Sequence, residues 1–393
     1  MRKLFSIPLI YLVVAAAVGL LLRWNIFAPI AGFRYGYWLH AHSHVMFLGW
    51  VFNFLNLIYL YNAFGGTWRA PYRWLFIVNQ FLITGMLIFF PIQGYGVVTI
   101  PLSVVHTVVS GVFCVKFILD TRQQRMDPAR KFAVWSLVFF LISSLGPFAL
   151  GPIMMQGLGQ SKWYYFAIYF YLHFQYNGVF LFGVLSMLSR WLDSHGLGSS
   201  NRVLLKAGTW LAAACFPTYA LSLLWTDVPI ILNWIGFAGA AMQAVALYLL
   251  WKEFTRVPVF SFFQKLSKPL VVVVALSFVM KLMLQLFSAF PYVAHLAYDY
   301  RYYVIAYLHL VLIGVVTLAI LIWYIEQRVV SINRIWIVVL LAGFLLSEIV
   351  MVLTPSLQAV ARYNAPILFY LSVPLFLGFV GFLIRSISTE HKS

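Results

Sequence analysis

Residues 301–326 read RYYVIAYLHLVLIGVVTLAILIWYIE, and no charged residue lies between Arg301 and Glu326. An apolar run of about 20 residues is long enough to cross the hydrocarbon core of a bilayer as a helix. Lipid offers the backbone no hydrogen bonds, so a helix, which pairs its own peptide groups, is the default way to span. The stretch therefore predicts a transmembrane helix, and it carries one histidine, His309.

Eleven further runs of the same kind occur along the 393 residues, of which 63% are hydrophobic and 9% charged. A soluble protein carries about 25% charged residues, so bilayer lipid must be the main solvent here. The runs are long and continuous, unlike the short alternating segments of a membrane β-barrel. We therefore expect 1–393 to be a single all-α polytopic membrane domain of about twelve helices. The runs lie near 5–22, 37–63, 72–91, 95–119, 131–151, 163–190, 203–225, 228–251, 268–290, 301–326, 331–354 and 363–385.

The net charge of +17 invites a nucleic-acid interpretation, but the placement of the cations argues against it. If the N-terminus is inside, twenty basic residues fall in or near inside segments and only five outside, which is the bias of the positive-inside rule. This bias predicts a bacterial-type inner membrane protein with both termini cytoplasmic. We interpret Met1-Arg2-Lys3 and the apolar run after it as a retained first helix, not a cleaved signal. The outside cations are Arg23, Arg34, Lys162, Arg301 and Arg362.

Histidines gather inside the predicted helices. Counted along their helices at about 1.5 Å per residue, one from each of four helices falls in a layer roughly 8 Å deep in the outer half of the membrane. Ionisable residues at this depth are costly and are candidates for function. The intramembrane set comprises His40, His42 and His44 on the second run, His106 on the fourth, His173 on the sixth and His309 on the tenth.

Imidazoles are the commonest metal ligands in proteins. Thiolates are absent from the layer, and Glu348 is the one carboxylate in the interior of a predicted span. All-histidine ligation among apolar walls suits heme, copper or non-heme iron better than calcium or magnesium. The alternative is that these histidines serve polar packing between helices, as in many membrane bundles.

Three segments resemble motifs of the heme–copper oxidase superfamily. The segment AHSHVMF at 41–47 resembles the helix-2 motif, in which an Ala-His pair precedes Val-Met at the third and fourth positions after the histidine. In that family this histidine ligates the low-spin heme, and His42 matches it. His40 and His44 leave the register open by two residues in either direction.

The segment AYLHL at 306–310, continuing to Gly314, is similar to helix 10 of the nitric oxide reductase large subunit. There two histidines separated by one residue bind the high-spin and the low-spin heme. His309 matches the low-spin ligand, and Tyr307 stands where the high-spin ligand would be. The segment HFQYNGVF at 173–180 resembles helix 6, where a histidine for the non-heme metal is followed four residues later by a glutamate. His173 matches the histidine, and Asn177 replaces the glutamate.

The departures from the family are as specific as the matches. Helix 7 of the family carries two adjacent histidines, whereas 215–222 reads CFPTYALS. The resemblance therefore implies a low-spin, bis-histidine heme b between His42 and His309, with an incomplete dinuclear centre and no second heme or non-heme metal. Arg362 matches the position of the family's propionate-binding arginines, and the alternative is that it anchors its loop at the membrane interface. No Cys-x-x-Cys-His occurs, so covalent c-type attachment is excluded.

Three functions stay open on the sequence. The first is a heme-binding electron-transfer or gas-linked protein of the respiratory chain, supplied by quinol or a donor subunit. The second is an active oxidase or nitric oxide reductase with unusual ligation, in which Tyr307 replaces the proximal histidine and His173 and His106 hold a second metal. The third is a cofactor-free transporter or accessory protein, with helices broken at Pro101 and Pro217.

Overall fold

The computed structural model describes residues 2–226 and 228–390, apart from the side chains of residues 2, 298, 358–362, 389 and 390. Within these residues every regular element is a helix and no strand occurs. The chain divides into two compact units, Met1–Thr121 with Leu321–Ser393, and Arg122–Ile320. An all-helical polytopic membrane fold is therefore confirmed.

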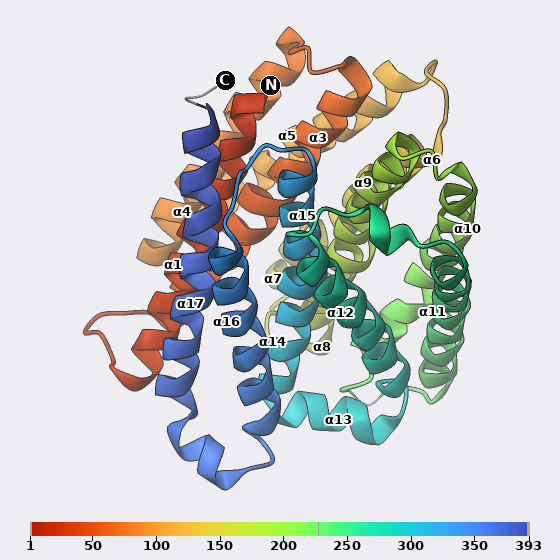
Figure 1. The fold of residues 1–393 in the computed structure, drawn as a ribbon. Helices are drawn as coiled ribbons and strands as arrows, with labels where there is room; N and C mark the ends of the chain where they lie inside the picture. The colour runs from red at the N-terminus through yellow and green to blue at the C-terminus, as the bar shows by residue number, and fades with distance from the viewer. Residues whose placement is uncertain (1, 227, 391–393) are drawn as a thin grey trace. The chain divides into compact units, whose positions relative to one another are not determined.

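The first unit pairs the two ends of the chain. Arg23, near the end of α1, donates to the carbonyl of Leu368 at 2.9 Å, in the first half of α17, so α1 and α17 run antiparallel. α16 and α17 also lie side by side (Figure 1). The elements are η1 (Arg2–Phe5), α1 (Ser6–Phe27), α2 (Tyr35–His44), η2 (Val45–Phe52), α3 (Asn53–Phe64), α4 (Ala70–Gln93), α5 (Thr99–Thr121), most of α15 (Leu318–Glu326), α16 (Arg334–Leu353) and α17 (Gln358–Glu390).

The second unit is built from helical hairpins. α10 packs on α11, α7 on α8, and α6 on α9, while α12 and η3 both contact η6. The elements are α6 (Pro128–Ser143), α7 (Leu145–Met155), α8 (Lys162–Phe174), η3 (Gln175–Phe180), α9 (Leu181–Ser194), α10 (Gly198–Cys215), η4 (Pro217–Ser222), α11 (Ile231–Arg256), η5 (Val259–Phe262), α12 (Lys268–Phe287), α13 (Pro291–Asp299), α14 (Arg301–His309) and η6 (Leu310–Thr317).

Local sequence signals set several helix ends. The Asp127 carboxylate accepts from the backbone N–H of Arg130 at 2.8 Å, and Pro128 follows in the first turn of α6. This arrangement supplies an acceptor for an orphan amide, and proline has no amide to lose. At the other end of a helix, Gly65 closes α3 at φ +60°, a left-handed conformation that glycine adopts without strain.

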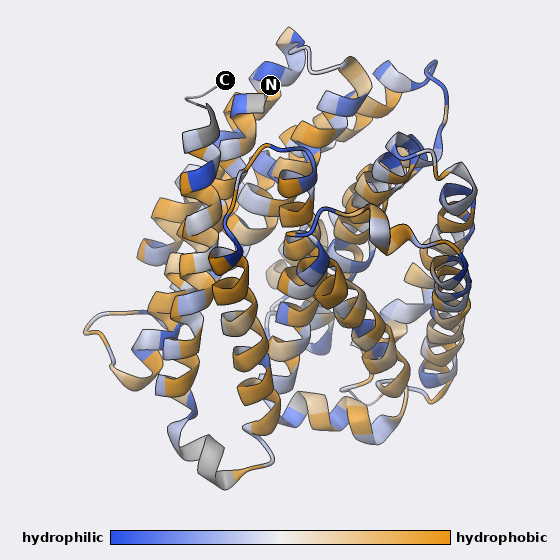
Figure 2. Ribbon diagram, in the orientation of Figure 1, coloured by the Kyte–Doolittle hydropathy of each residue, from blue (hydrophilic) through white to orange (hydrophobic). Residues whose placement is uncertain are grey.

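Each of the twelve apolar runs falls on helix, but in residues 2–226 and 228–390 ten helices are long and apolar enough to count as candidate spans. The two remaining segments are 162–194 and 198–222. Tyrosines, amides and small polar residues dilute their hydropathy. Figure 2 shows orange along most long helices and blue in connections such as 122–127. A multi-pass membrane protein is supported, and the number twelve stays a prediction.

The two prolines behave differently. Pro101 lies in the first turn of α5, where it leaves the helix intact. Pro217 marks a real interruption, because α10 ends at Cys215 and a short 3₁₀ helix, η4, follows. The expectation of broken helices therefore holds at Pro217 and fails at Pro101.

Candidate functional site

Three stretches of π-helix occur in the described chain, and each begins within two residues of a histidine. η2 starts one residue after His44, η3 two residues after His173 and η6 one residue after His309. A glycine follows each histidine by five residues: Gly49, Gly178 and Gly314. π-Helical turns are rare and are frequent at functional sites. These are the helices in which the motif resemblance was found.

The histidines of helix 2 point two ways. His42 faces α1: its Nδ1 lies 2.8 Å from the carbonyl oxygen of Ala15. A Cβ built on Gly19 would lie 3.1 Å from His42 Cε1, so glycine is what lets the ring approach α1 so closely. A carbonyl can only accept, so Nδ1 carries the proton and Nε2 the lone pair, which is the tautomer that a metal ligand needs.

His40 and His44 face α4 and the turn that follows it. The His44 ring lies 4.5 Å from that of Phe90, and the His40 ring 4.6 Å from that of Tyr95. His44 Nδ1 lies 2.9 Å from the carbonyl oxygen of His40, which again places the ring proton on Nδ1. This second face of helix 2 is thus lined by imidazoles and aromatic rings.

His106 lies on α5 and is 1% exposed. Its Nε2 is buried and has no hydrogen-bond partner in the described structure, and His44 is near enough to interact with it electrostatically. One turn further along α5, Ser110 accepts a hydrogen bond from the Asn79 side chain at 3.3 Å. His106 is therefore a buried imidazole with an unused nitrogen, beside a second imidazole.

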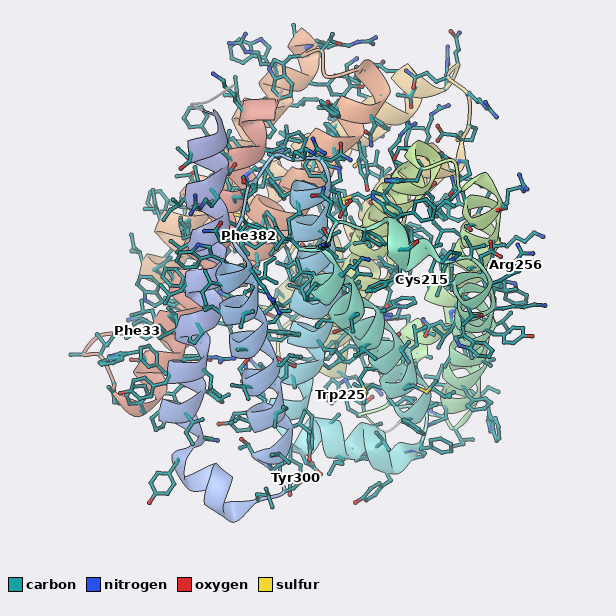
Figure 3. The ribbon with its side chains drawn as sticks, viewed as in Figure 1. Phe33, Cys215, Trp225, Arg256, Tyr300 and Phe382 are labelled. Atoms are coloured by element: carbon teal, nitrogen blue, oxygen red, sulfur yellow. The ribbon has the colours of Figure 1, made fainter. Side chains whose placement is uncertain are left out.

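His173 contrasts with His106, because both of its ring nitrogens are engaged. Nε2 lies 2.8 Å from the carbonyl oxygen of Cys215, and Nδ1 lies 3.2 Å from the amide nitrogen of Asn177. The tautomer that satisfies both contacts donates from Nε2 and accepts at Nδ1. The Cys215 thiol sulfur is 4.0 Å from Nε2; Cys215 is labelled in Figure 3. A metal at His173 would have to displace one of these hydrogen bonds.

The sequence interpretation missed Lys281, which is 1% exposed in the middle of α12. Its ammonium donates to Gln285 Oε1 at 2.8 Å. Among the described residues no carboxylate pairs with it. It is near enough to His173 and Cys215 to interact with both electrostatically. The signal that would have found it is simple: a lysine in the centre of a predicted span is costly and marks a site.

The structure shows the surroundings of only some of the remaining predicted site residues. Tyr307 lies in α14 with its ring edge-on to Tyr176, the centroids 6.0 Å apart. This contact brings η3 and α14 together within one turn of His173 and His309. His42 belongs to the first unit and His309 to the second, so their pairing stays a prediction. Arg362 falls in α17, and its side chain lies outside the described residues.

In the part of the chain that the structure describes, no three His, Cys, Asp or Glu side chains converge to hold a metal ion. A bis-histidine heme needs only two such ligands, so this finding leaves it untested. Both cysteines, Cys114 and Cys215, are buried and free.

No protein-family model matches the chain, and no curated protein matches it. The resemblance to heme–copper oxidases therefore rests on the three motifs alone.

Proposed function

We propose that this chain is a membrane redox protein that holds one low-spin heme b between His309 and a helix-2 histidine, His42 by its motif. The observation that carries the proposal is that rare π-helix directly follows both α2, which carries His42, and α14, which ends at His309. A π-turn shifts the register of the following helix and re-aims its side chains. A ligand-bearing helix gains from that adjustment. The π-segment after His173 accompanies a histidine whose two nitrogens the fold already hydrogen-bonds.

The residues of helix 2 fit an axial ligand. The Ala15 carbonyl holds the His42 ring by its Nδ1–H, so in this tautomer the lone pair lies on Nε2, the nitrogen that would ligate iron. Buried neighbours such as Phe47 and Leu48 exclude water from this part of the unit. When bound between two imidazoles, heme supplies a one-electron iron couple suited to electron transfer.

We further propose that no second metal centre forms at His173. Its two ring nitrogens are already hydrogen-bonded. The buried Lys281 ammonium, near His173 and Cys215, would repel a metal cation placed beside them. Little turnover of oxygen or nitric oxide is then expected from this chain alone. Its electrons would come from quinol or from a donor subunit in the cytoplasmic membrane.

An optical spectrum of the purified protein tests the proposal. We expect a sharp b-type band on reduction, about one heme per chain by pyridine hemochrome, and loss of both in His309→Ala. The matched control is His295→Ala, an exposed histidine in α13. Full heme content in His309→Ala would overturn the assignment. A second, high-spin component would favour the enzyme with Tyr307 as a heme ligand, and absence of visible absorbance would favour the cofactor-free transporter.

A further inference from the structure

Helix 2 presents its histidines on opposite faces. Residues four apart share a helical face, and residues two apart do not. His40 and His44 accordingly contact Phe90 and Tyr95, while His42 binds the Ala15 carbonyl on α1. The face with His40 and His44 takes no part in the proposed heme ligation, so its own chemistry is open.

Two imidazole nitrogens on this side are available as ligands for a metal ion. The Nδ1–H of His44 is held by the His40 carbonyl, which leaves the lone pair on Nε2. The Nε2 of His106 is buried without a hydrogen-bond partner. A buried polar nitrogen without a partner is costly and calls for an explanation. The His44 ring lies against Phe90 on α4, and α4 packs along α5, which carries His106.

The Met86 side chain lies one turn from a residue that touches His44 and accepts a hydrogen bond from a residue one turn from His106. Met86 is fully buried on α4, one turn before Phe90, whose ring touches His44. On its other side the Met86 sulfur accepts a hydrogen bond from Ser103 at 3.4 Å. Ser103 lies on α5 three residues before His106, on the same face of that helix. Met86 is thus within one helical turn of the neighbours of both histidines.

We propose that His44 Nε2, His106 Nε2 and the Met86 sulfur form a copper(I) site. A thioether is a soft ligand that selects copper(I), and neutral imidazoles also bind copper. None of the three proposed ligands is a carboxylate of the kind that favours magnesium, calcium or manganese. A monovalent ion is also the least costly metal charge in a water-poor interior. The Met86 thioether would supply the third ligand beside the two imidazoles.

The test is an anaerobic competition titration of the purified full-length chain against copper(I)–bicinchoninate. We expect the parent to withdraw one copper(I) per chain. His106→Gln keeps a polar side chain of similar size and should abolish withdrawal. Met86→Leu is nearly isosteric, should leave the fold intact and should weaken binding about tenfold or more. Copper affinity equal to that of the parent in both variants overturns the site.

Two controls separate this site from its surroundings. Met154→Leu and His195→Gln alter an exposed methionine and an exposed histidine and should leave copper binding unchanged. X-ray absorption of the copper-loaded parent should show a sulfur neighbour that disappears in Met86→Leu, and a sulfur signal that persists contradicts the assignment. Heme content should not change in Met86→Leu, so the copper and heme proposals succeed or fail separately.

Discussion

At the residue scale, burial alone does not tell a ligand from a structural histidine; the hydrogen-bond partners do. His106 and His173 are both 1% exposed. His173 has partners for both nitrogens, so the fold already uses it. His106 keeps one buried nitrogen without a partner. The sequence grouped both residues as candidate metal ligands, and only their surroundings separate them.

The first prediction concerns the register of the helix-2 ligand. His42→Ala should reduce heme content as severely as His309→Ala, because either change leaves iron with one protein ligand. His40→Ala and His44→Ala should retain heme, since their rings face α4. Heme quantification and the reduced spectrum of the three variants make the comparison. Heme lost in His44→Ala and kept in His42→Ala would move the ligand by two residues.

The second prediction concerns the buried Lys281–Gln285 pair. Replacing both residues by apolar ones, as in Lys281→Met with Gln285→Leu, should raise the melting temperature or leave it unchanged. Substitution of a buried charged group by apolar side chains is often neutral or stabilising by about 1–4 kcal/mol. Gln285→Leu alone should lower the melting temperature, because the ammonium loses its 2.8 Å acceptor.

Thermal unfolding in detergent gives the measurement for this pair, and Lys206→Met, at an exposed position of α10, is the control. A double variant less stable than Gln285→Leu alone would show that the Lys281 ammonium is satisfied by something other than Gln285.

At the element scale, the π-helical stretches depend on close packing at their glycines. A Cβ on Gly49 would lie 2.8 Å from Tyr11 Cγ, and one on Gly178 would lie 2.6 Å from Phe139 Cβ. Helices in membranes use small residues to let backbones and rings approach. Each of these two π-segments is therefore held at its glycine against a neighbouring helix, α1 for η2 and α6 for η3.

The third prediction follows from this packing. Gly178→Ala should destabilise the protein by about 1–3 kcal/mol, the usual cost of overpacking. Gly151→Ala is the matched control in α7: no atom lies within 4 Å of its added Cβ, so it should stabilise by about 0.4–1 kcal/mol through the unfolded chain. Melting temperatures of the two variants decide the matter. Equal and small shifts of the same sign would contradict the packing argument.

At the scale of the whole molecule, the antiparallel contact of α1 with α17 brings the start of α1 and the end of α17 to the same end of the first unit (Figure 1). Chain ends on one side of a membrane require an even number of crossings. Ten and twelve both satisfy that requirement. The segments 162–194 and 198–222 decide between ten and twelve crossings. An even count requires that both segments span the membrane or that neither does.

The fourth prediction is that residues 195–197 lie in the cytoplasm. With twelve crossings this loop is inside, beside Arg190 and Arg202, as the positive-inside rule favours. With ten crossings it would lie outside. A reporter inserted after His195 reads the side directly: green fluorescence without alkaline phosphatase activity is expected.

Reporters at 122–127 and 94–98 calibrate the assay, and we expect them inside and outside respectively. Phosphatase activity at 195–197 together with these expected controls would reduce the count to ten. A reporter at 122–127 found outside would overturn the whole orientation.

Sequence alone determined the membrane character of this protein, because long apolar runs and few charges leave lipid as the only suitable solvent. Helix positions followed for the same reason. The sequence also showed which helix carries each histidine. The motif resemblance and the orientation inferred from charge went further than the structure tests.

Only the tertiary structure decided what each polar residue touches. Neighbours from other helices or other turns determine the state of each imidazole. They supply the carbonyl partner of His42 and engage the nitrogens of His173, and they leave one nitrogen of His106 without a partner. The packing also brings Lys281 near His173 and Cys215, both of which are more than sixty positions away in the sequence. A helix period places a side chain on a face, but the packing of several helices determines which donor or acceptor meets it there.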